Sequence, residues 1–169
     1  MSQSAAEHRA TAPAALACAV VTISDTRTAE TDTGGQAVVD HLMAAGHRVV
    51  AREIVPDDPE RLRAVLFSLE NRGELDVVLC TGGTGISSRD QTFQTLGSLM
   101  TTPLPGYGEL LRMLSYQEIG AAAMLSRAIG GLIGRIVVLT MPGSPAAVNL
   151  AMEKLILPEV GHLVREARR

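Results

Sequence analysis

Apolar residues follow two alternating patterns along the chain. Short continuous apolar runs, typical of strands buried on both faces, alternate with longer segments whose apolar residues recur at helical spacing. The predicted strands span residues 16–23, 48–55, 76–80 and 135–140. The predicted helices span residues 34–45, 58–73, 92–100 and 109–116, with a last one starting at Pro145. This alternation predicts an α/β fold of three layers (α/β/α), in which helices cover both faces of a mostly parallel sheet.

Prolines and their neighbours mark several element ends. Asp58 and Ser144 each precede a proline, the order in which an N-cap side chain and a first-turn proline begin a helix. Residues 103–106, PLPG, are expected to interrupt the helical pattern. Pro158 is expected to kink or restart the last helix.

One stretch, residues 117–134, fits two structures. Residues 121–125 could continue a helix, because small and apolar side chains dominate there. Residues 126–133 could form a short strand before the next buried strand begins. The apolar pattern does not decide between them.

The chain is expected to form a single domain. Its 169 residues suit one hydrophobic core, and no internal repeat or linker divides them. Residues 1–13 are polar and rich in alanine and serine, so we expect a disordered tail before a domain spanning residues 14–169. The tail lacks the apolar segment of a signal peptide, and the longest apolar run, residues 14–21, is too short to cross a membrane. We therefore expect a cytoplasmic protein without membrane association.

Composition narrows the class of ligand. Aromatic residues make up only 2% of the chain and the formal net charge is −3, so neither base stacking nor a basic surface for nucleic acid is indicated. Of 15 basic residues, only Lys154 is a lysine. Because no lysine lies near a glycine-rich loop, a P-loop is excluded. A phosphate group would be met by arginine, by backbone N–H groups or by a metal ion.

Polar residues collect where the predicted strands end. In a parallel sheet, ligands bind beyond the carboxyl ends of the strands. Four segments follow these ends: Ser24-Asp25, Pro56-Asp57, the loop Thr81–Asp90 and the turn Pro142–Ser144. Together they supply carboxylates, hydroxyl groups and glycine backbone, so we expect one binding site at this edge of the sheet.

The loop Thr81–Asp90, with the sequence TGGTGISSRD, is the strongest candidate for binding a phosphorylated ligand. Its small residues are Thr81, Gly82, Gly83, Thr84 and Gly85. Glycines here let the backbone turn tightly and direct N–H groups at an anion. At the end of the loop, Arg89 can pair with phosphate oxygens and Asp90 can hold Mg²⁺. The alternative is a tight strand-to-helix turn that binds nothing.

Two carboxylates, Asp57 and Asp90, are expected to hold Mg²⁺, since this ion typically uses one or two carboxylates together with substrate phosphates. Asp57 could instead cap the following helix, although Asp58 is better placed for that task. Asp25 is either a ligand contact or a turn residue. Ser144 can cap its own helix and still contact a phosphate at the same N-terminus.

These motifs together resemble the MoaB/Mog family of molybdenum cofactor biosynthesis, which includes molybdopterin adenylyltransferase. The resemblance spans roughly residues 15–160. It is carried by TISDT at 22–26, VPDD at 55–58, TGGTG and RDQT within 81–92, PGYGE at 105–109, LSR at 125–127 and MPGSP at 141–145. The family implies an α/β molybdopterin-binding fold, usually a homotrimer and sometimes a hexamer. It also implies that ATP with Mg²⁺ adenylylates the terminal phosphate of molybdopterin and that pyrophosphate is released.

The resemblance also assigns residues. The family's catalytic aspartates fall on Asp57 and Asp90, while Ser126 and Arg127 match its LSR motif. Taken with the strand ends, the expected substrate-binding residues are Ser24, Asp25, Thr81, Gly82, Gly83, Thr84, Gly85, Arg89, Ser126, Arg127, Pro142, Gly143 and Ser144. The family further implies that other proteins of the pathway are possible partners.

Two positions depart from the family pattern. Gly34 stands where the family commonly has a serine, so the hydroxyl contact of that serine is missing here. Phe93 replaces a proline, so we expect a looser start of the helix that follows Asp90. Asp90 itself is retained.

The chemistry expected from these residues is in-line attack of the molybdopterin phosphate on the α-phosphorus of ATP. Asp57 and Asp90 would hold Mg²⁺, and Arg89, with Arg27 or Arg127, would offset phosphate charge. One alternative is a non-catalytic module that binds molybdopterin or a partner protein of the same pathway. Another, a nicotinamide-dependent oxidoreductase, fits less well because no glycine fingerprint follows the first strand.

Overall fold

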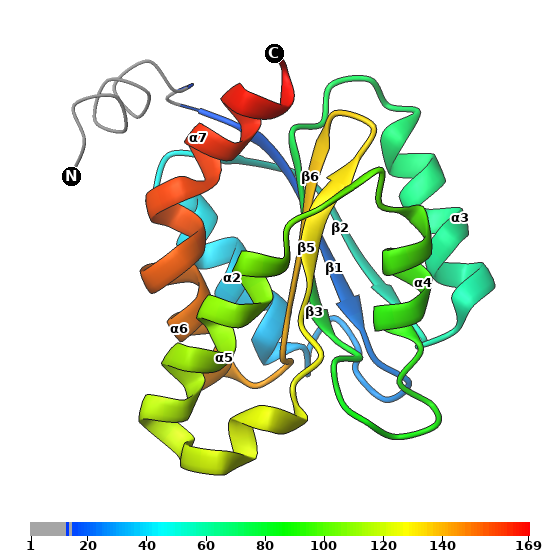
Figure 1. Ribbon diagram of the computed structural model, residues 1–169. Coiled ribbons are helices and arrows are strands. Elements are labelled where there is room, and N and C mark those ends of the chain that lie inside the picture. Colours follow the sequence, from blue (N-terminus) through cyan, green and yellow to red (C-terminus); the bar gives the residue numbers. More distant parts are fainter. Residues whose placement is uncertain (1–12, 14) are drawn as a thin grey trace.

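A six-stranded sheet forms the middle layer of the molecule. The computed structural model describes residue 13 and residues 15–169, and it shows the sheet between two groups of helices (Figure 1). The strands are hydrogen-bonded in the order β2-β1-β3-β6-β5-β4. Their bounds are β1 Ala17–Ile23, β2 Arg48–Val55, β3 Val77–Gly82, β4 Thr102–Pro103, β5 Gly130–Ile133 and β6 Ile136–Met141. The tail predicted for residues 1–13 lies, apart from residue 13, outside the described residues.

Most of the sheet is parallel, as predicted. β2, β1, β3 and β6 run in the same direction, and these are the four strands that the apolar runs indicated. β5 pairs antiparallel with β6, and β4 pairs antiparallel with β5. The short edge strand β4, which includes a proline, carries no apolar run that could have indicated it.

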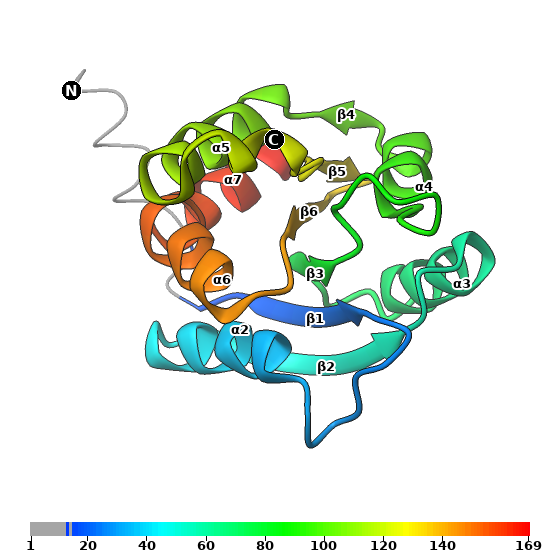
Figure 2. The ribbon, with the colours of Figure 1, turned by 90° about the horizontal axis from the view of Figure 1, so that it is seen from below.

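Helices cover both faces of the sheet, which confirms the three layers. One face carries α2 Thr33–Ala44, α5 Pro105–Ile119, α6 Pro145–Ala151 and α7 Leu157–Ala167, and the other carries α3 Pro59–Glu70 and α4 Thr92–Leu99 (Figure 2). In β1, Cys18 and Val20 pack into the core under the first group, whereas Ala19 and Val21 pack into the core under the second. Alternate residues of a strand point to opposite faces, so a strand covered on both sides is apolar throughout.

The start of one helix differs from the prediction, and the structure decides two points that the sequence left open. α5 begins at Pro105 rather than at residue 109, because proline is tolerated in the first turn of a helix. Both structures proposed for residues 117–134 occur in succession, as a 3₁₀ helix over Gly120–Leu125 and then β5. Before Pro158, a π-helical stretch over Met152–Ile156 joins α6 to α7, and the proline occupies the first turn of α7.

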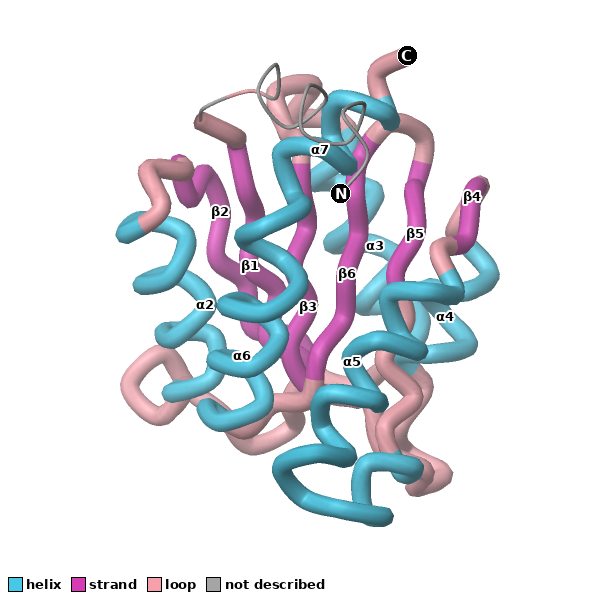
Figure 3. Tube along the Cα trace, turned by 60° about the vertical axis from the view of Figure 1, so that its left-hand side comes forward, coloured by secondary structure: helices cyan, strands magenta, loops and turns pink. Residues whose placement is uncertain are grey.

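The parallel strands bring the predicted segments to one edge. The loops that follow β1, β2, β3 and β6 gather at the lower end of the sheet (Figure 3). The register pairs Ile23 with both Val55 and Gly82, so these three strands end side by side. Within the described part of the chain, no helix is long and apolar enough to cross a membrane.

Candidate functional site

The glycine-rich loop lies directly against the carboxylate of Asp57. Gly83, just after β3, has a φ of +63°, a conformation that L side chains rarely adopt. A Cβ at this position would lie 2.0 Å from Thr92 Oγ1 and 2.6 Å from Asp57 Oδ2. Only glycine lets the loop backbone approach the carboxylate so closely. The ends of β2 and β3 therefore lie side by side, as predicted, and their forming one binding site stays a prediction.

Asp57 binds the start of α4 through one of its oxygens. Oδ1 accepts hydrogen bonds from the Gln91 backbone N–H at 3.0 Å and from the Thr92 hydroxyl at 3.2 Å. The N-cap residue of α4, Gln91, forms no capping bond with its own side chain, so Asp57 does this from 34 residues away. Asp58 caps α3 by accepting from the Arg61 N–H, as predicted.

The second oxygen of Asp57 has no hydrogen-bond partner. Oδ2 is the one buried side-chain oxygen or nitrogen in the described residues of which this is true. Burial raises the pKa of Asp57, the bonds from Gln91 and Thr92 lower it in part, and the nearby carboxylates of Asp90 and Asp25 raise it further. The net pKa is above the usual value, because the ionised form is poorly compensated. A cation bound at Oδ2 would supply the missing compensation.

Asp90 ends the loop, and its carboxylate packs back against Gly85 and Ser87. Its Oδ2 accepts from the Ser87 N–H at 2.9 Å and would lie 2.8 Å from a Cβ at Gly85. The charge of Asp90 contributes to the raised pKa of Asp57. No group of three or more Asp, Glu, His or Cys residues with the arrangement of a metal centre occurs in the described chain. Carboxylate oxygens, such as the unpartnered Oδ2 of Asp57, are donors of the kind that Mg²⁺ takes together with phosphate oxygens or water.

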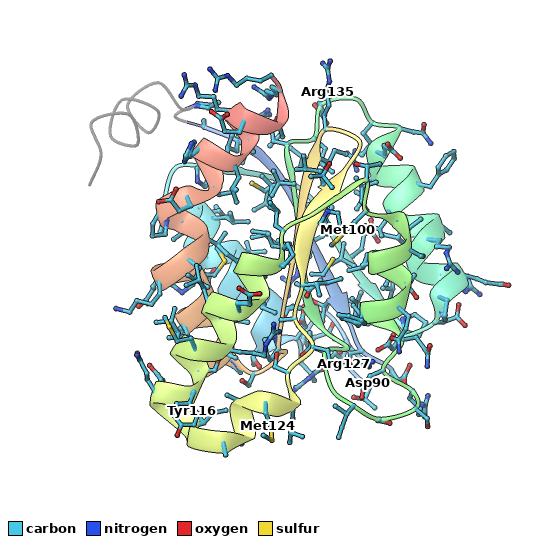
Figure 4. The ribbon with its side chains drawn as sticks, viewed as in Figure 1. Asp90, Met100, Tyr116, Met124, Arg127 and Arg135 are labelled. Atoms are coloured by element: carbon cyan, nitrogen blue, oxygen red, sulfur yellow. The ribbon has the colours of Figure 1, made fainter. Side chains whose placement is uncertain are left out.

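Arginines near the loop have partners within the protein. Arg89, whose side chain is 77% exposed, forms an ion pair with Asp25 at 2.6 Å. Arg27 donates to the Thr31 carbonyl in its own loop. Arg127 donates to the carbonyl oxygens of Gly85 and Asp90, and Figure 4 shows Arg127 and Asp90 together at the lower end of the sheet. Of these three arginines, Arg89 is paired through a single exposed contact at the protein surface.

The turn after β6 adjoins the base of the loop. The Thr81 hydroxyl donates to the Pro142 carbonyl at 3.2 Å, and a Cβ at Gly143 would lie 3.5 Å from Gly82 Cα. Ser144 accepts from the Ala147 N–H at 3.3 Å, which confirms it as the N-cap of α6. The turn Pro142–Ser144 thus lies beside the glycine-rich loop at the same edge of the sheet.

The hydroxyls of Ser24 and Ser126 are engaged in local turns. Ser24 Oγ accepts from the backbone N–H groups of Thr26 and Arg27 at 3.3 and 3.2 Å. Ser126 Oγ accepts from the Ala128 N–H at 3.4 Å. Both residues shape the loops around the site, and a direct contact of either hydroxyl with a ligand stays a prediction.

A further carboxylate, Asp32, was not among the predicted site residues. It is only 3% exposed, caps α2 by accepting from the Gly35 N–H, and forms an ion pair with Arg52 at 3.0 Å. The cap could have been inferred from the sequence, because an aspartate directly precedes the first turn of the helix. The partner on β2 could not.

Fold and site together define a class: a three-layer α/β domain with an acidic pair and a glycine-rich loop at the carboxyl edge of its parallel strands. Comparison with known proteins gives a family. The family described as "Probable molybdopterin binding domain" matches residues 19–162. The molybdenum cofactor biosynthesis protein B of Bacillus cereus is 52% identical over 167 residues, which cover 98% of this chain and 99% of that protein.

Solved structures agree. A crystal structure of a molybdenum cofactor biosynthesis protein B has a TM-score of 0.90 at 52% identity, covering 94% of this chain and 99% of that one. The tungsten cofactor synthesizing protein MoaB from Pyrococcus furiosus has a TM-score of 0.82 at 36% identity, covering 94% and 100%. The chain belongs to the MoaB/Mog family of molybdopterin-binding domains, and this membership supports a role in molybdenum cofactor biosynthesis.

Proposed function

We propose that the protein binds molybdopterin and ATP at the loop Thr81–Asp90 and transfers an adenylyl group to the terminal phosphate of molybdopterin. The observation that carries this proposal is the buried, unpartnered Oδ2 of Asp57 beside Asp90 and the glycine-rich loop. A buried carboxylate with an uncompensated charge is characteristic of functional sites. A structural role alone would leave this oxygen paired, as both oxygens of Asp32 are.

The proposed reaction forms one bond and breaks one. An oxygen of the molybdopterin phosphate attacks the α-phosphorus of ATP, the bond from the α-phosphorus to the bridging oxygen breaks, and pyrophosphate leaves with that oxygen. Asp57 and Asp90 would hold Mg²⁺, which would neutralise phosphate charge when bound. The backbone at Gly82, Gly83 and Gly85 would approach the phosphates, since these three residues carry no side chain. Arg89 would add positive charge from its exposed position.

The test is release of pyrophosphate from Mg-ATP by the purified protein on addition of molybdopterin. Asp90→Asn keeps the size of the side chain but removes the charge, so release should fall by about 10²–10³-fold. Asp40→Asn removes the same charge from the exposed surface of α2 and should act like the wild type. Near-normal release by Asp90→Asn would show that the assignment of Asp90 is wrong.

The second candidate is a module that binds molybdopterin without transferring adenylate. The missing hydroxyl at Gly34 favours it, whereas the retained pair of Asp57 and Asp90 favours catalysis. Tight binding of molybdopterin with no pyrophosphate release at any ATP concentration would establish the module and reject the enzyme.

We also propose that copies of the chain associate as a homotrimer or hexamer through α5 and the 3₁₀ helix that follows. Large apolar side chains are exposed there, and Tyr116 and Met124 lie close together in Figure 4. The exposed apolar residues are Leu110, Met113, Tyr116, Ile119, Met124 and Leu125. Tyr116→Glu should lower the mass measured by light scattering to that of a smaller assembly, whereas Met43→Glu, at an exposed position on α2, should not. A monomeric wild type would reject the proposal.

A further inference from the structure

Arg127 holds the glycine-rich loop at its middle and at its end. Its backbone N–H donates to the Thr84 carbonyl at 2.8 Å, and its side-chain Nε donates to the Gly85 carbonyl at 2.6 Å. Its Nη2 donates to the carbonyl of Asp90 itself. A single residue, about 40 positions away in the chain, therefore fixes the loop at its last glycine and again at its aspartate.

The ring of Phe93 supports the guanidinium of Arg127. The ring centroid lies 5.6 Å from Arg127 Cζ, within the range of a cation–π interaction. The N–H donors of a guanidinium lie in its plane, whereas an aromatic ring contacts its face. The two sets of contacts are therefore compatible: the N–H groups donate to the carbonyls while Cζ lies over the ring of Phe93.

Phe93 lies in the first turn of α4, and Asp57 binds the start of the same helix through Gln91 and Thr92. The segment between Thr84 and Thr92 is thus anchored from two sides, by Arg127 and by Asp57. Asp90 has its carbonyl held by Arg127 and its carboxylate bonded to the Ser87 N–H. Where the Asp90 carboxylate stands relative to Asp57 depends on both anchors.

We infer that Arg127, oriented by the ring of Phe93, is a positioning residue for Asp90, acting through the loop backbone. Its Nε and Nη2 donate to two loop carbonyls and its Cζ lies over the ring, so we expect its effect on the reaction to pass through the placement of Asp90. The kinetic part of this inference rests on the proposed adenylyl transfer. The structural part, order in the loop, does not.

Substitution of Arg127 by lysine distinguishes a positioning role from direct contact with phosphate. A lysine keeps the positive charge but cannot donate from two nitrogens of a rigid fork to two fixed carbonyls. If Arg127 acts by position, Arg127→Lys and Arg127→Met should both lower kcat for pyrophosphate release by about 10–100-fold, with KM for ATP little changed. If it contacts phosphate, lysine should restore much of the activity that methionine loses, and the loss should appear in KM.

Phe93 provides the second arm of the kinetic test. Phe93→Tyr keeps the aromatic face and should match the wild type, whereas Phe93→Leu removes it and should lower kcat by about two- to fivefold. Adding Phe93→Leu to Arg127→Lys should bring little further loss, because the ring acts through the arginine. Arg135→Lys, at the opposite end of the molecule (Figure 4), is the matched control and should change nothing.

Amide hydrogen exchange of the full chain without ligands tests the inference independently of catalysis. In Arg127→Lys and Phe93→Leu, exchange should become faster at residues 85–92, while the amides of β1 and β3 stay protected and show that the fold is intact. If the wild type releases no pyrophosphate, the proposed function fails and exchange alone decides this inference. Unchanged exchange at 85–92, or rescue of kcat by lysine, would overturn it.

Discussion

Two aspartates at the same edge of the sheet, Asp32 and Asp57, have the same local task and opposite surroundings. Each carboxylate binds a backbone N–H at the start of a helix, that of Gly35 for α2 and that of Gln91 for α4. The second oxygen of Asp32 accepts from the Thr22 hydroxyl at 2.8 Å and from Arg52 at 3.0 Å. The second oxygen of Asp57 is buried and accepts nothing.

The pKa values of the two groups separate accordingly. Burial would raise the pKa of Asp32, but the bonds from Gly35, Thr22 and Arg52 outweigh it, and the net pKa lies below the usual value. For Asp57, burial and the neighbouring carboxylates prevail over its two bonds, and the pKa is raised. A paired buried carboxylate stabilises the fold, whereas an uncompensated one is tolerated where a ligand supplies its partner. The contrast indicates a structural role for Asp32 and supports the binding role proposed for Asp57.

The largest effect is expected for Asp57→Asn. Pyrophosphate release should fall by about 10²–10³-fold, because the variant loses the charge that would hold Mg²⁺. The melting temperature without ligands should stay equal or rise, since the amide oxygen can still accept from Gln91 and the uncompensated charge is gone. Thermal melts and activity of the same preparation test both halves. A clear fall in melting temperature would mean that Asp57 is structural like Asp32, and the comparison would break.

Asp32→Ala should give the opposite result. Removing this carboxylate leaves Arg52 without its ion-pair partner and α2 without its cap, so the free energy of unfolding should fall by about 2–4 kcal/mol. Molecules that remain folded should keep their ability to bind the ligand. Urea unfolding measures the loss, and Asp32→Asn, which can retain the cap, should lose less. A loss below about 0.5 kcal/mol would mean that Asp32 contributes no more to stability than an ordinary surface residue, and its structural role would be rejected.

Asp32 and Asp57 should contribute with opposite signs to the pH dependence of the free energy of unfolding. The pKa of Asp32 is lowered from 3.8, so its contribution is fully present above that value and is lost as pH falls through the folded pKa. The pKa of Asp57 is raised from 3.8, so its ionisation costs stability as pH rises from 3.8 through the folded pKa.

Urea unfolding with a metal chelator measures this dependence. Compared with the wild type, Asp32→Asn should be less stable at neutral pH, and the gap should close only below about pH 4. Asp57→Asn should be more stable than the wild type at neutral pH, and this difference should vanish as pH falls towards 4. Difference curves of the same sign for the two variants would contradict the assignment of opposite roles.

How much of the fold and of the site could be predicted from the sequence depends on how far apart in the chain the interacting residues lie. The four parallel strands and the caps at Asp58 and Ser144 are local patterns, and the structure confirms them. The gathering of four segments at one edge followed from the direction of the strands. The bond from Asp57 to Gln91 spans 34 residues and that from Arg127 to Gly85 spans 42, so no local pattern indicates either. Adenylyl transfer and the bound ligands stay predictions.

The smallest effect concerns Gly34, where the family commonly has a serine. Gly34 lies in the first turn of α2, two residues after Asp32, and a Cβ there would lie 2.5 Å from the Gly143 carbonyl oxygen. Gly97, within α4, would present its Cβ with nothing closer than 3.9 Å. Alanine usually stabilises a helix relative to glycine by about 0.5–1 kcal/mol where there is room.

Gly97→Ala should therefore raise the free energy of unfolding, whereas Gly34→Ala should lower it by about 1 kcal/mol as the turn Pro142–Ser144 is pushed away. Urea unfolding of the two variants side by side measures the difference. The same displacement would weaken the bond between the Thr81 hydroxyl and the Pro142 carbonyl, so ligand affinity should also fall slightly. If Gly34→Ala stabilises as much as Gly97→Ala, the turn can yield, and a serine at position 34 could restore the family's hydroxyl contact. In that case the Gly143 carbonyl oxygen does not prevent a side chain at position 34.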